Sequence, residues 1–272
     1  MQNNEPLISI IIPVFNAQKY IEETILSVIG QTYRNWELIV VDDCSKDDSV
    51  IIVQRMMVSD SRIQLIESEE NFGGPAKPRN MGMQVSNGQY IAFLDNDDVW
   101  VKDKLERQIN CFLLNDNIDI VHTRAYTINN QGVETGVFNN QRVFNILKIL
   151  FKEKYVLFFS NNVNINTVLM KSTVNKKFRE DKNVVTIEDW MFWLDNKLNE
   201  KNFFLMKDEL AYYRISEYSL SSKSGNKIYK KTYYMYALYL IEMKISTPLY
   251  TALFVKNTIN LIVGKLKNLS GN

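Results

Sequence analysis

The sequence predicts an α/β fold in which a mostly parallel sheet is flanked by helices. Through the first 115 or so residues, short apolar segments rich in β-branched residues alternate with segments of helical periodicity. Repeated β-α units of this size imply parallel strands. Acidic residues directly follow two of the apolar segments, at Asp42–Asp43 and at Asp95–Asp98. Ligands bind beyond the carboxyl ends of parallel strands, so these acids mark the expected site.

The first half of the chain is interpreted as four strands and four helices. Continuous apolar runs, typical of strands buried on both faces, predict strands over residues 7–16, 36–43, 62–68 and 90–95. Helical spacing of apolar residues and a glycine-containing lead-in predict helices over residues 19–31, 45–57, 79–86 and 101–115. Ser45 is the expected N-cap of the second helix.

The alternation weakens after residue 118, where a strand pair is expected over residues 119–138 with its turn at Asn129–Gly132. A helix over residues 143–155 and a strand over residues 162–170 are predicted next.

The last third of the chain begins with a predicted helix from about Ile187, with Thr186 as its N-cap and acids in its first turn. Residues 203–216 are interpreted as a strand or a hairpin. From Tyr229 onward the chain is predicted to be helical and aromatic, with a break near Pro248.

Composition excludes some classes of protein. The net charge is +1, so the chain has no general affinity for nucleic acid. Cys44 and Cys111 form no metal-ligand spacing, and two thiols without a secretory leader indicate a reducing cytoplasm. The apolar run at the N-terminus is too short to span a bilayer.

The most informative segment is the acidic cluster Asp95-Asn96-Asp97-Asp98 after the fourth strand. Carboxylates beside an apolar strand repel one another and lose hydration, so such a cluster usually holds a cation. Oxygen ligands suit Mg²⁺ or Mn²⁺, which share coordination between one or two carboxylates and substrate phosphates. A D-x-D at a strand end therefore suggests a metal-nucleotide site. The alternative is an ordinary turn, since Asp and Asn are common turn residues.

Three segments together strongly resemble family 2 glycosyltransferases. They are residues 8–49, residues 71–98 and the sequence IEDWMFWLD, which begins at Ile187. The similarity is continuous over about the first 115 residues and patchier to about residue 220, where it favours the bacterial surface-polysaccharide branch. The resemblance implies the GT-A fold, a Rossmann-like sheet flanked by helices. It also implies a divalent metal, and transfer of a sugar from a nucleotide diphosphate with inversion at the anomeric carbon.

On the donor side, the resemblance assigns the first nucleotide-binding loop to Pro13, Phe15 and Asn16. Asp43 corresponds to the carboxylate that hydrogen-bonds the base, typically uracil, since a carboxylate accepts from an N–H edge. An Asx-type turn ahead of Ser45 is the alternative for this residue.

The same resemblance places a donor loop at Gly73, Gly74 and Arg79, where glycines permit close approach of backbone to ligand. A simple turn is the competing interpretation of the glycines.

The resemblance makes Asp97 the direct ligand of Mn²⁺ or Mg²⁺, with Asp95 or Asn96 on the ribose or on a metal-bound water. Asp98 is either part of this site or a supporting group beside it. Asp189 corresponds to the catalytic base, because an attacking alcohol needs a carboxylate within reach of its proton. Glu188, its neighbour, is better explained by the helix dipole.

One departure from the family concerns a histidine that many relatives carry after the Y-R pair. Ser216 stands near that place here, and His122, the chain's one histidine, is interpreted as a strand residue. Arg214 is expected either to brace the diphosphate or to form a structural ion pair.

We expect a catalytic domain over residues 1–222, with a nucleotide-binding half (1–115) and an acceptor-binding half (116–222), and a helical extension over residues 223–272. Between Lys223 and Lys267 there are eight lysines and one acid. Such basic, aromatic helices fit either an anionic membrane surface at the inner face of the plasma membrane, or packing on the catalytic domain or on a second subunit.

The leading function is therefore transfer of a sugar from a nucleotide-sugar donor to a glycan or lipid-linked sugar acceptor. A non-catalytic sugar-nucleotide binder or scaffold is the alternative, although a binder has no need of a base at Asp189. A nucleotidyltransferase is disfavoured, because no basic glycine-rich loop follows the first strand.

Overall fold

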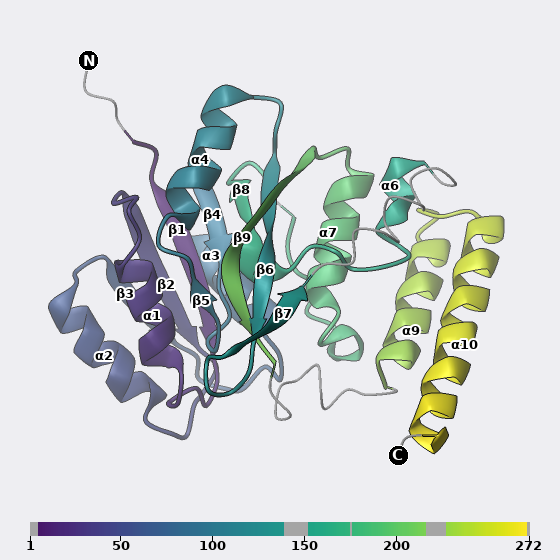
Figure 1. Cartoon of the computed structure of the whole chain (residues 1–272), viewed down its shortest axis with the longest axis horizontal. Coiled ribbons are helices and arrows are strands. Elements are labelled where there is room, and N and C mark those ends of the chain that lie inside the picture. The colour runs from purple at the N-terminus through teal and green to yellow at the C-terminus, as the bar shows by residue number, and fades with distance from the viewer. Residues whose placement is uncertain (1–4, 139–151, 175, 216–226, 271–272) are drawn as a thin grey trace.

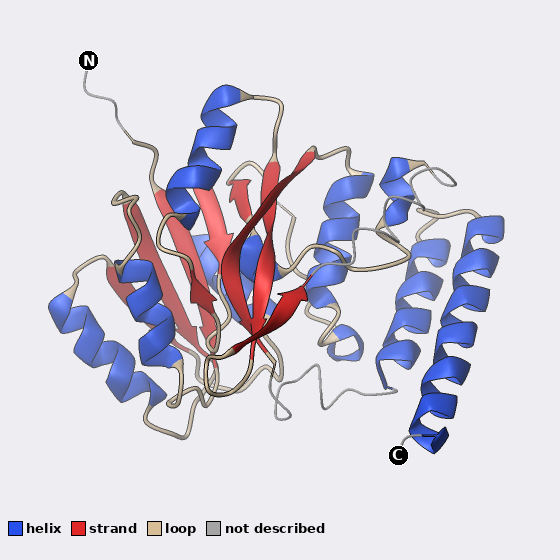
Figure 2. Cartoon of the chain, viewed as in Figure 1, coloured by secondary structure: helices blue, strands red, loops and turns tan. Residues whose placement is uncertain are grey.

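The computed structural model describes residues 5–138, 152–174, 176–215 and 227–270. Its strands form one mixed nine-stranded sheet in the order β3-β2-β1-β4-β8-β6-β9-β5, with β7 paired to β6. Helices cover both faces of this sheet (Figure 2). The α/β class predicted from the sequence is confirmed, and a helical extension follows the sheet at the C-terminus.

The parallel part of the sheet is the part that the sequence predicted. Its strands are β1 (Ile8–Val14), β2 (Trp36–Asp42), β3 (Ile63–Glu67) and β4 (Tyr90–Phe93). Their neighbouring pairs β1–β2, β1–β4 and β2–β3 are all parallel. The helices between and after them are α1 (Ile21–Ile29), α2 (Ser49–Ser59), α3 (Ala76–Val85) and α4 (Lys104–Leu114). Every residue of β1 and β2 is buried, which explains their continuous apolar runs.

Two predicted helix caps are wrong. Helix α2 begins at Ser49 after Asp48, because the Ser45 hydroxyl instead accepts a hydrogen bond from the Asn16 N–H at 2.9 Å. Helix α7 (Glu188–Leu198) has Ile187 at its N-cap, with no side-chain cap bond. In both places the residue expected to cap belongs to the loop that leads into the helix.

The second half of the sheet is mixed. It contains β5 (Val99–Trp100), β6 (Ile120–Ile128), β7 (Glu134–Phe138), β8 (Leu169–Lys171) and β9 (Phe203–Arg214). The predicted strand pair is confirmed as antiparallel β6–β7, and its turn is closed by the Gly132 N–H bonding to the Asn129 carbonyl at 3.0 Å. Residues 203–214 form one long strand that pairs with β6 and β5. The short β5 was not predicted.

Two predictions around residue 160 need correction. The strand expected over residues 162–170 is a 3₁₀ turn, η1 (Ile165–Thr167), followed by the three-residue strand β8. The helix expected over residues 143–155 falls mostly outside the described residues, and helix α6 (Glu153–Val156) contains its end. A second 3₁₀ turn, η2 (Lys182–Val184), leads toward α7.

The C-terminal helices pack on the catalytic part of the chain. Helices α9 (Lys227–Ile241) and α10 (Thr247–Ser270) lie side by side near α7, at the opposite end of the molecule from α1 and α2 (Figure 1). Buried residues of both helices share an apolar cluster with α7, among them Tyr236, Tyr239 and Leu253. The predicted break between the helices is confirmed, with Pro248 in the first turn of α10. The domain boundary at residue 222 stays a prediction.

Candidate active site

Asp43 follows β2 and holds the loop that precedes α3. Its Oδ1 accepts a hydrogen bond from the Phe72 N–H at 2.9 Å, and its carbonyl accepts one from Asn71 Nδ2 at 2.8 Å. Gly73 has a φ of 79°, the left-handed region that glycine enters at little cost. Burial raises the pKa of Asp43, while the N–H groups of Phe72 and Gly73 oppose that rise. The donor loop is thus fastened to this carboxylate.

The predicted nucleotide loop lies beside it, at the end of β1. Asn16 has a φ of 49°, and its Oδ1 accepts a hydrogen bond from the Lys46 N–H at 2.8 Å. This left-handed turn leaves Phe15 47% exposed while Pro13 stays buried within β1. An exposed aromatic ring at the carboxyl edge of a parallel sheet offers a flat surface to a planar base.

The acidic turn Asp95–Asp98 connects β4 to β5. Asn96 Nδ2 donates to the Pro13 carbonyl at 3.2 Å, which fixes the turn to the end of β1. Asp97 is partly exposed, and burial together with the neighbouring charge of Asp95 raises its pKa to about 6. A carboxylate in this position gains from a cation, because like charge and lost hydration both oppose its ionised form.

Asp98 is the buried residue of the acidic turn and fixes the turn through hydrogen bonds. It is 0% exposed, and its Oδ1 accepts a hydrogen bond from the Arg214 N–H at 2.7 Å. Asn166 Nδ2 donates to its other oxygen. Burial raises the pKa of Asp98 well above its usual range. Of the two alternatives for Asp98, these contacts favour the supporting role.

Arg214 forms the structural ion pair that was one of its two predicted roles. Its Nη2 lies 2.8 Å from Glu23 Oε2, and its Nε donates to the Asp97 carbonyl at 2.7 Å. The side chain is 2% exposed, so it holds the acidic turn rather than facing solvent. His122 is buried in β6, as expected of a strand residue. Ser216 lies outside the described residues.

Arg79 joins the donor side of the site to helix α7. Its Nη2 lies 2.7 Å from Asp95 Oδ1, and its Nη1 lies 3.0 Å from Glu188 Oε1. Helix α3, which carries Arg79, can pack closely on strand β1 because Gly82 has no side chain. A Cβ at Gly82 would lie 2.6 Å from Ile11 Cγ2. The Arg79 side chain is 3% exposed. Direct contact with nucleotide stays a prediction, whereas these contacts make Arg79 a positioning residue.

Asp189 stands in the first turn of α7, next to Glu188. Its Oδ1 accepts a hydrogen bond from the Trp190 N–H at 2.7 Å, and its Oδ2 accepts one from Asn161 Nδ2 at 3.1 Å. Burial and the charge of Glu188 raise its pKa to about 7, against the opposing charge of Arg79. A carboxylate with a pKa near neutrality is well matched to accepting a proton from an alcohol.

The Arg79 bridge joins Asp95 of the acidic turn to Glu188, the residue before Asp189. Asn16 and Asp43 follow the neighbouring parallel strands β1 and β2, at the same edge of the sheet. Gly74 also reaches the acceptor half, because a Cβ there would lie 3.0 Å from Val185 Cγ2. Two residues that matter were missed. Asn161 contacts Asp189, and the Asn166 Oδ1 accepts from the Asp95 N–H at 2.6 Å. The asparagine-rich run Asn161–Asn166 within an apolar segment was the available signal.

The carboxylates fit a hard divalent cation only in part. Among the described residues, no group of three or more His, Cys, Asp or Glu side chains is arranged to hold a metal by itself. Mg²⁺ and Mn²⁺ commonly take one or two carboxylates and complete their coordination with phosphate and water. The partly exposed Asp97, with its raised pKa, fits that arrangement.

With this geometry in place, comparison with known proteins identifies the family. Residues 9–200 match the family described as glycosyl transferase family 2. The chain belongs to this family. It is 34% identical over 238 residues to the putative teichuronic acid biosynthesis glycosyltransferase TuaG of Bacillus subtilis, covering 87% of this chain and 89% of the relative.

A second relative is the UDP-Glc:alpha-D-GlcNAc-diphosphoundecaprenol beta-1,3-glucosyltransferase WfgD of Escherichia coli. It is 35% identical over 228 residues, covering 82% of each chain. Among solved structures, the mannosyltransferase PcManGT of Pyrobaculum calidifontis, in complex with GDP-Man and Mn²⁺, has a TM-score of 0.67 and 14% identity. That match covers 99% of this chain and 77% of the other, and it supports the GT-A fold alone.

Proposed function

We propose that this family 2 glycosyltransferase moves a sugar, with inversion, from a UDP-sugar to a hydroxyl group of a glycan acceptor in bacterial surface polysaccharide synthesis. The observation that carries the proposal is the Arg79 bridge, which sets the Asp189 base beside the acidic turn that follows β4. The names of the relatives support the rest: one is assigned to teichuronic acid synthesis, and one uses UDP-Glc with a diphosphoundecaprenol-linked acceptor.

On this proposal the donor lies across the carboxyl ends of β1, β2 and β4. Asp43 reads the base, Phe15 lies against it, and Asn16 shapes the loop around it. The ribose and diphosphate then extend toward Asp95, Asn96 and Asp97. This order follows the order of the strands in the sheet, from β2 through β1 to β4.

Asp189 takes the proton from the acceptor hydroxyl as that oxygen attacks the anomeric carbon. Asn161 and the Trp190 N–H hold the carboxylate in one orientation. Inversion requires a single base on the face opposite the leaving group, and no covalent intermediate. A divalent cation, Mn²⁺ or Mg²⁺ held by Asp97, would stabilise negative charge on the departing diphosphate.

Location at the inner face of the plasma membrane is part of the proposal, since the donor and acceptor classes meet there. Among the helices that the structure describes, none is long and apolar enough to cross a membrane. The alternative of a non-catalytic binder gains no support, and the catalytic proposal is supported by Asp189, whose pKa is raised to about 7 and whose carboxylate accepts two hydrogen bonds.

A panel of UDP- and GDP-sugars with Mn²⁺ tests the proposal, with slow donor hydrolysis and thermal stabilisation as readouts. We expect UDP-sugars such as UDP-glucose to stabilise the protein and to be hydrolysed slowly by it. No GDP-sugar should do either. Stabilisation by GDP-sugars alone would contradict the assignment of the donor.

A further inference from the structure

A cavity lined by both polar and apolar side chains lies between α7 and the C-terminal helices, one residue away from Asp189. It has a volume of about 280 Å³ and is lined from α7, α9, α10 and the segment that follows α6. Asn161 lines this cavity and also donates to Asp189 Oδ2 at 3.1 Å. Small-molecule sites begin at about 300 Å³, so this cavity is near the lower limit for one compact group.

The lining of this cavity suits a sugar. Trp190 offers an aromatic wall, held in place by its Nε1 donating to the Leu157 carbonyl at 2.6 Å. Amide side chains come from Asn161, Asn257 and Asn260. Aromatic faces and fixed amides together provide an apolar wall and directional hydrogen bonds.

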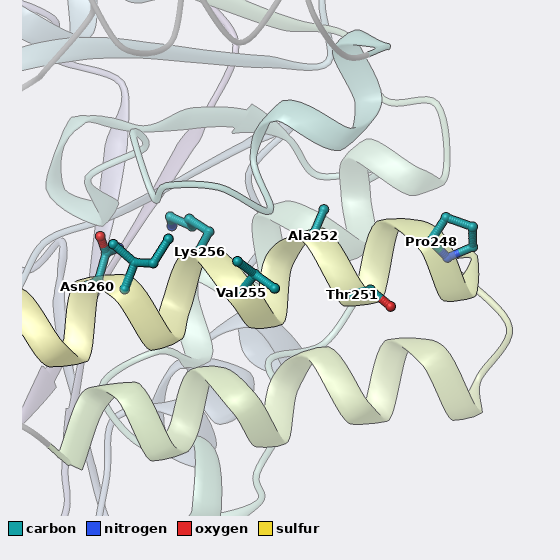
Figure 3. Close-up of a pocket in the computed structure, with 7 residues that line it drawn as sticks. Pro248, Thr251, Ala252, Val255, Lys256 and Asn260 are labelled. Carbon is teal, nitrogen blue, oxygen red and sulfur yellow. The ribbon is translucent and has the colours of Figure 1, made fainter.

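An open groove of about 570 Å³ continues from the cavity along α10. Its lining residues follow one another along the helix, from Pro248 at one end to Asn260 at the other (Figure 3). Val255 and Ile259 lie in it and are 50% and 54% exposed. The groove is therefore apolar and open to solvent.

Lys256 lines both the cavity and the groove. Its Nζ donates to the Phe159 carbonyl, and no carboxylate of the described residues lies within 4.0 Å of it in an ion pair. Burial lowers the pKa of Lys256 to about 8. A partly buried ammonium group that has a carbonyl partner but no counter-ion is suited to an anionic ligand.

We propose that the cavity and groove form the acceptor site for a lipid-linked sugar diphosphate. The sugar occupies the cavity beside Asp189, the diphosphate meets Lys256, and the lipid chain runs along α10 over Val255 and Ile259. The order sugar, anion, lipid in such a molecule is the order of the amide-lined cavity, Lys256 and the more apolar groove in the protein. The inference rests on the proposed function, and it assigns to the C-terminal helices a part in substrate binding.

The test uses the full chain and farnesyl diphosphate as a probe, titrated by calorimetry in EDTA so that no metal bridges the probe to the acidic turn. Wild-type protein should bind it, and Lys256→Gln should bind about tenfold or more weakly, because a hydrogen bond to a charged group is lost. Val255→Asp should also weaken binding, while Lys230→Gln, an exposed lysine of α9 outside both cavities, should not.

Two further arms make the result decisive. Lys256→Arg keeps the positive charge and should bind the probe nearly as well as the wild type. This variant shows whether charge matters even if Lys256→Gln folds poorly. Farnesol, which has the chain without the diphosphate, should bind much more weakly than farnesyl diphosphate. Equal affinity of wild type and Lys256→Gln for the probe, or equal affinity of wild type for farnesol and farnesyl diphosphate, would overturn the inference.

A parallel titration of each variant with UDP and Mn²⁺ separates the two proposals. UDP binding without farnesyl diphosphate binding refutes the acceptor site alone. Absence of UDP binding to the wild-type chain refutes the proposed function itself.

Discussion

The two sides of the candidate site differ in the charge that each offers to a diphosphate. On the donor side, Asp43, Asp95 and Asp97 stand at strand ends, and burial raises the pKa of Asp43 and Asp97. On the acceptor side, Lys256 stands at the junction of the cavity and the groove with a carbonyl as its partner. On the two proposals above, a diphosphate on the donor side is held through a metal cation, whereas a diphosphate on the acceptor side meets the Lys256 ammonium group. The predictions below test this difference.

The link between the two sides is the Arg79 bridge, which touches Asp95 on one side and Glu188 on the other. Glu188 in turn neighbours the base. The four predictions below each change one part of this arrangement: the base Asp189, the Arg79 bridge, the packing of the C-terminal helices, or the charge of Glu188.

The largest effect is expected for Asp189→Asn. The amide keeps the size of the side chain but cannot accept a proton at neutral pH, so transfer should fall by about 10²–10⁴-fold. UDP binding should be unchanged, because the donor side lacks this residue. Steady-state kinetics and UDP titration measure the two, with the exposed Asp116→Asn as control. A variant that keeps more than about a tenth of wild-type turnover would remove Asp189 as the base.

Arg79→Met should break the link between the sides. It leaves Asp95 and Glu188 without their shared cation, and breaking a buried ion pair from one partner costs about 3–5 kcal/mol of unfolding free energy. Urea denaturation gives the value. Arg55→Met, at an exposed position of α2, is the matched control and should cost almost nothing. Equal losses in the two variants would mean that the bridge does not stabilise the site.

Leu253→Ala tests the packing of the C-terminal helices on the rest of the chain. The Leu253 side chain on α10 is fully buried, so its truncation should lower the free energy of unfolding by about 2–5 kcal/mol. Ile262→Ala, 52% exposed on the same helix, should cost less than about 0.5 kcal/mol. The same packing predicts that removing all residues after Lys227 destabilises the catalytic part, as thermal melting would show. A truncated protein that melts like the full chain would contradict this packing.

The smallest effect is a shift in the pH dependence of turnover. Asp189 works as a carboxylate, and burial with the Glu188 charge raises its pKa to about 7, so kcat should fall as pH drops below about 7. Glu188→Gln removes a negative charge that favours the protonated form of Asp189, so the pKa of Asp189 should fall. The acid limb of the kcat profile should therefore move to lower pH in that variant. A limb at the same pH in both proteins would show that another group titrates.

The positions of the carboxylates proposed for the donor side could be predicted from the sequence because these residues follow strands. Asp43, Asp95 and Asp97 come directly after apolar runs, and parallel strands bring their carboxyl ends to one edge. The resemblance assigned Arg79 to the donor loop, whereas the structure places it in helix α3. Its two ion pairs were not predicted, since no sequence pattern reveals that Asp95 and Glu188 meet at its two nitrogens.

The acceptor side could not be predicted in the same way. Lys256 contacts a carbonyl from Phe159, and Asn161 contacts Asp189, so the cavity joins segments that only the tertiary packing brings together. The lysine-rich tail was correctly predicted to be helical. Its charge suggested a membrane surface as readily as a substrate site, because a count of lysines does not show which of them is partly buried.

Calorimetry of UDP binding tests the central claim, that the donor side is acidic and needs a divalent cation. Wild-type protein should bind UDP in Mn²⁺ and lose that binding in EDTA, whereas Asp97→Ala should bind weakly in both. Farnesyl diphosphate binding should remain in EDTA, since the acceptor side has its own cation. Equal UDP affinity of the wild-type chain with and without EDTA would contradict the account.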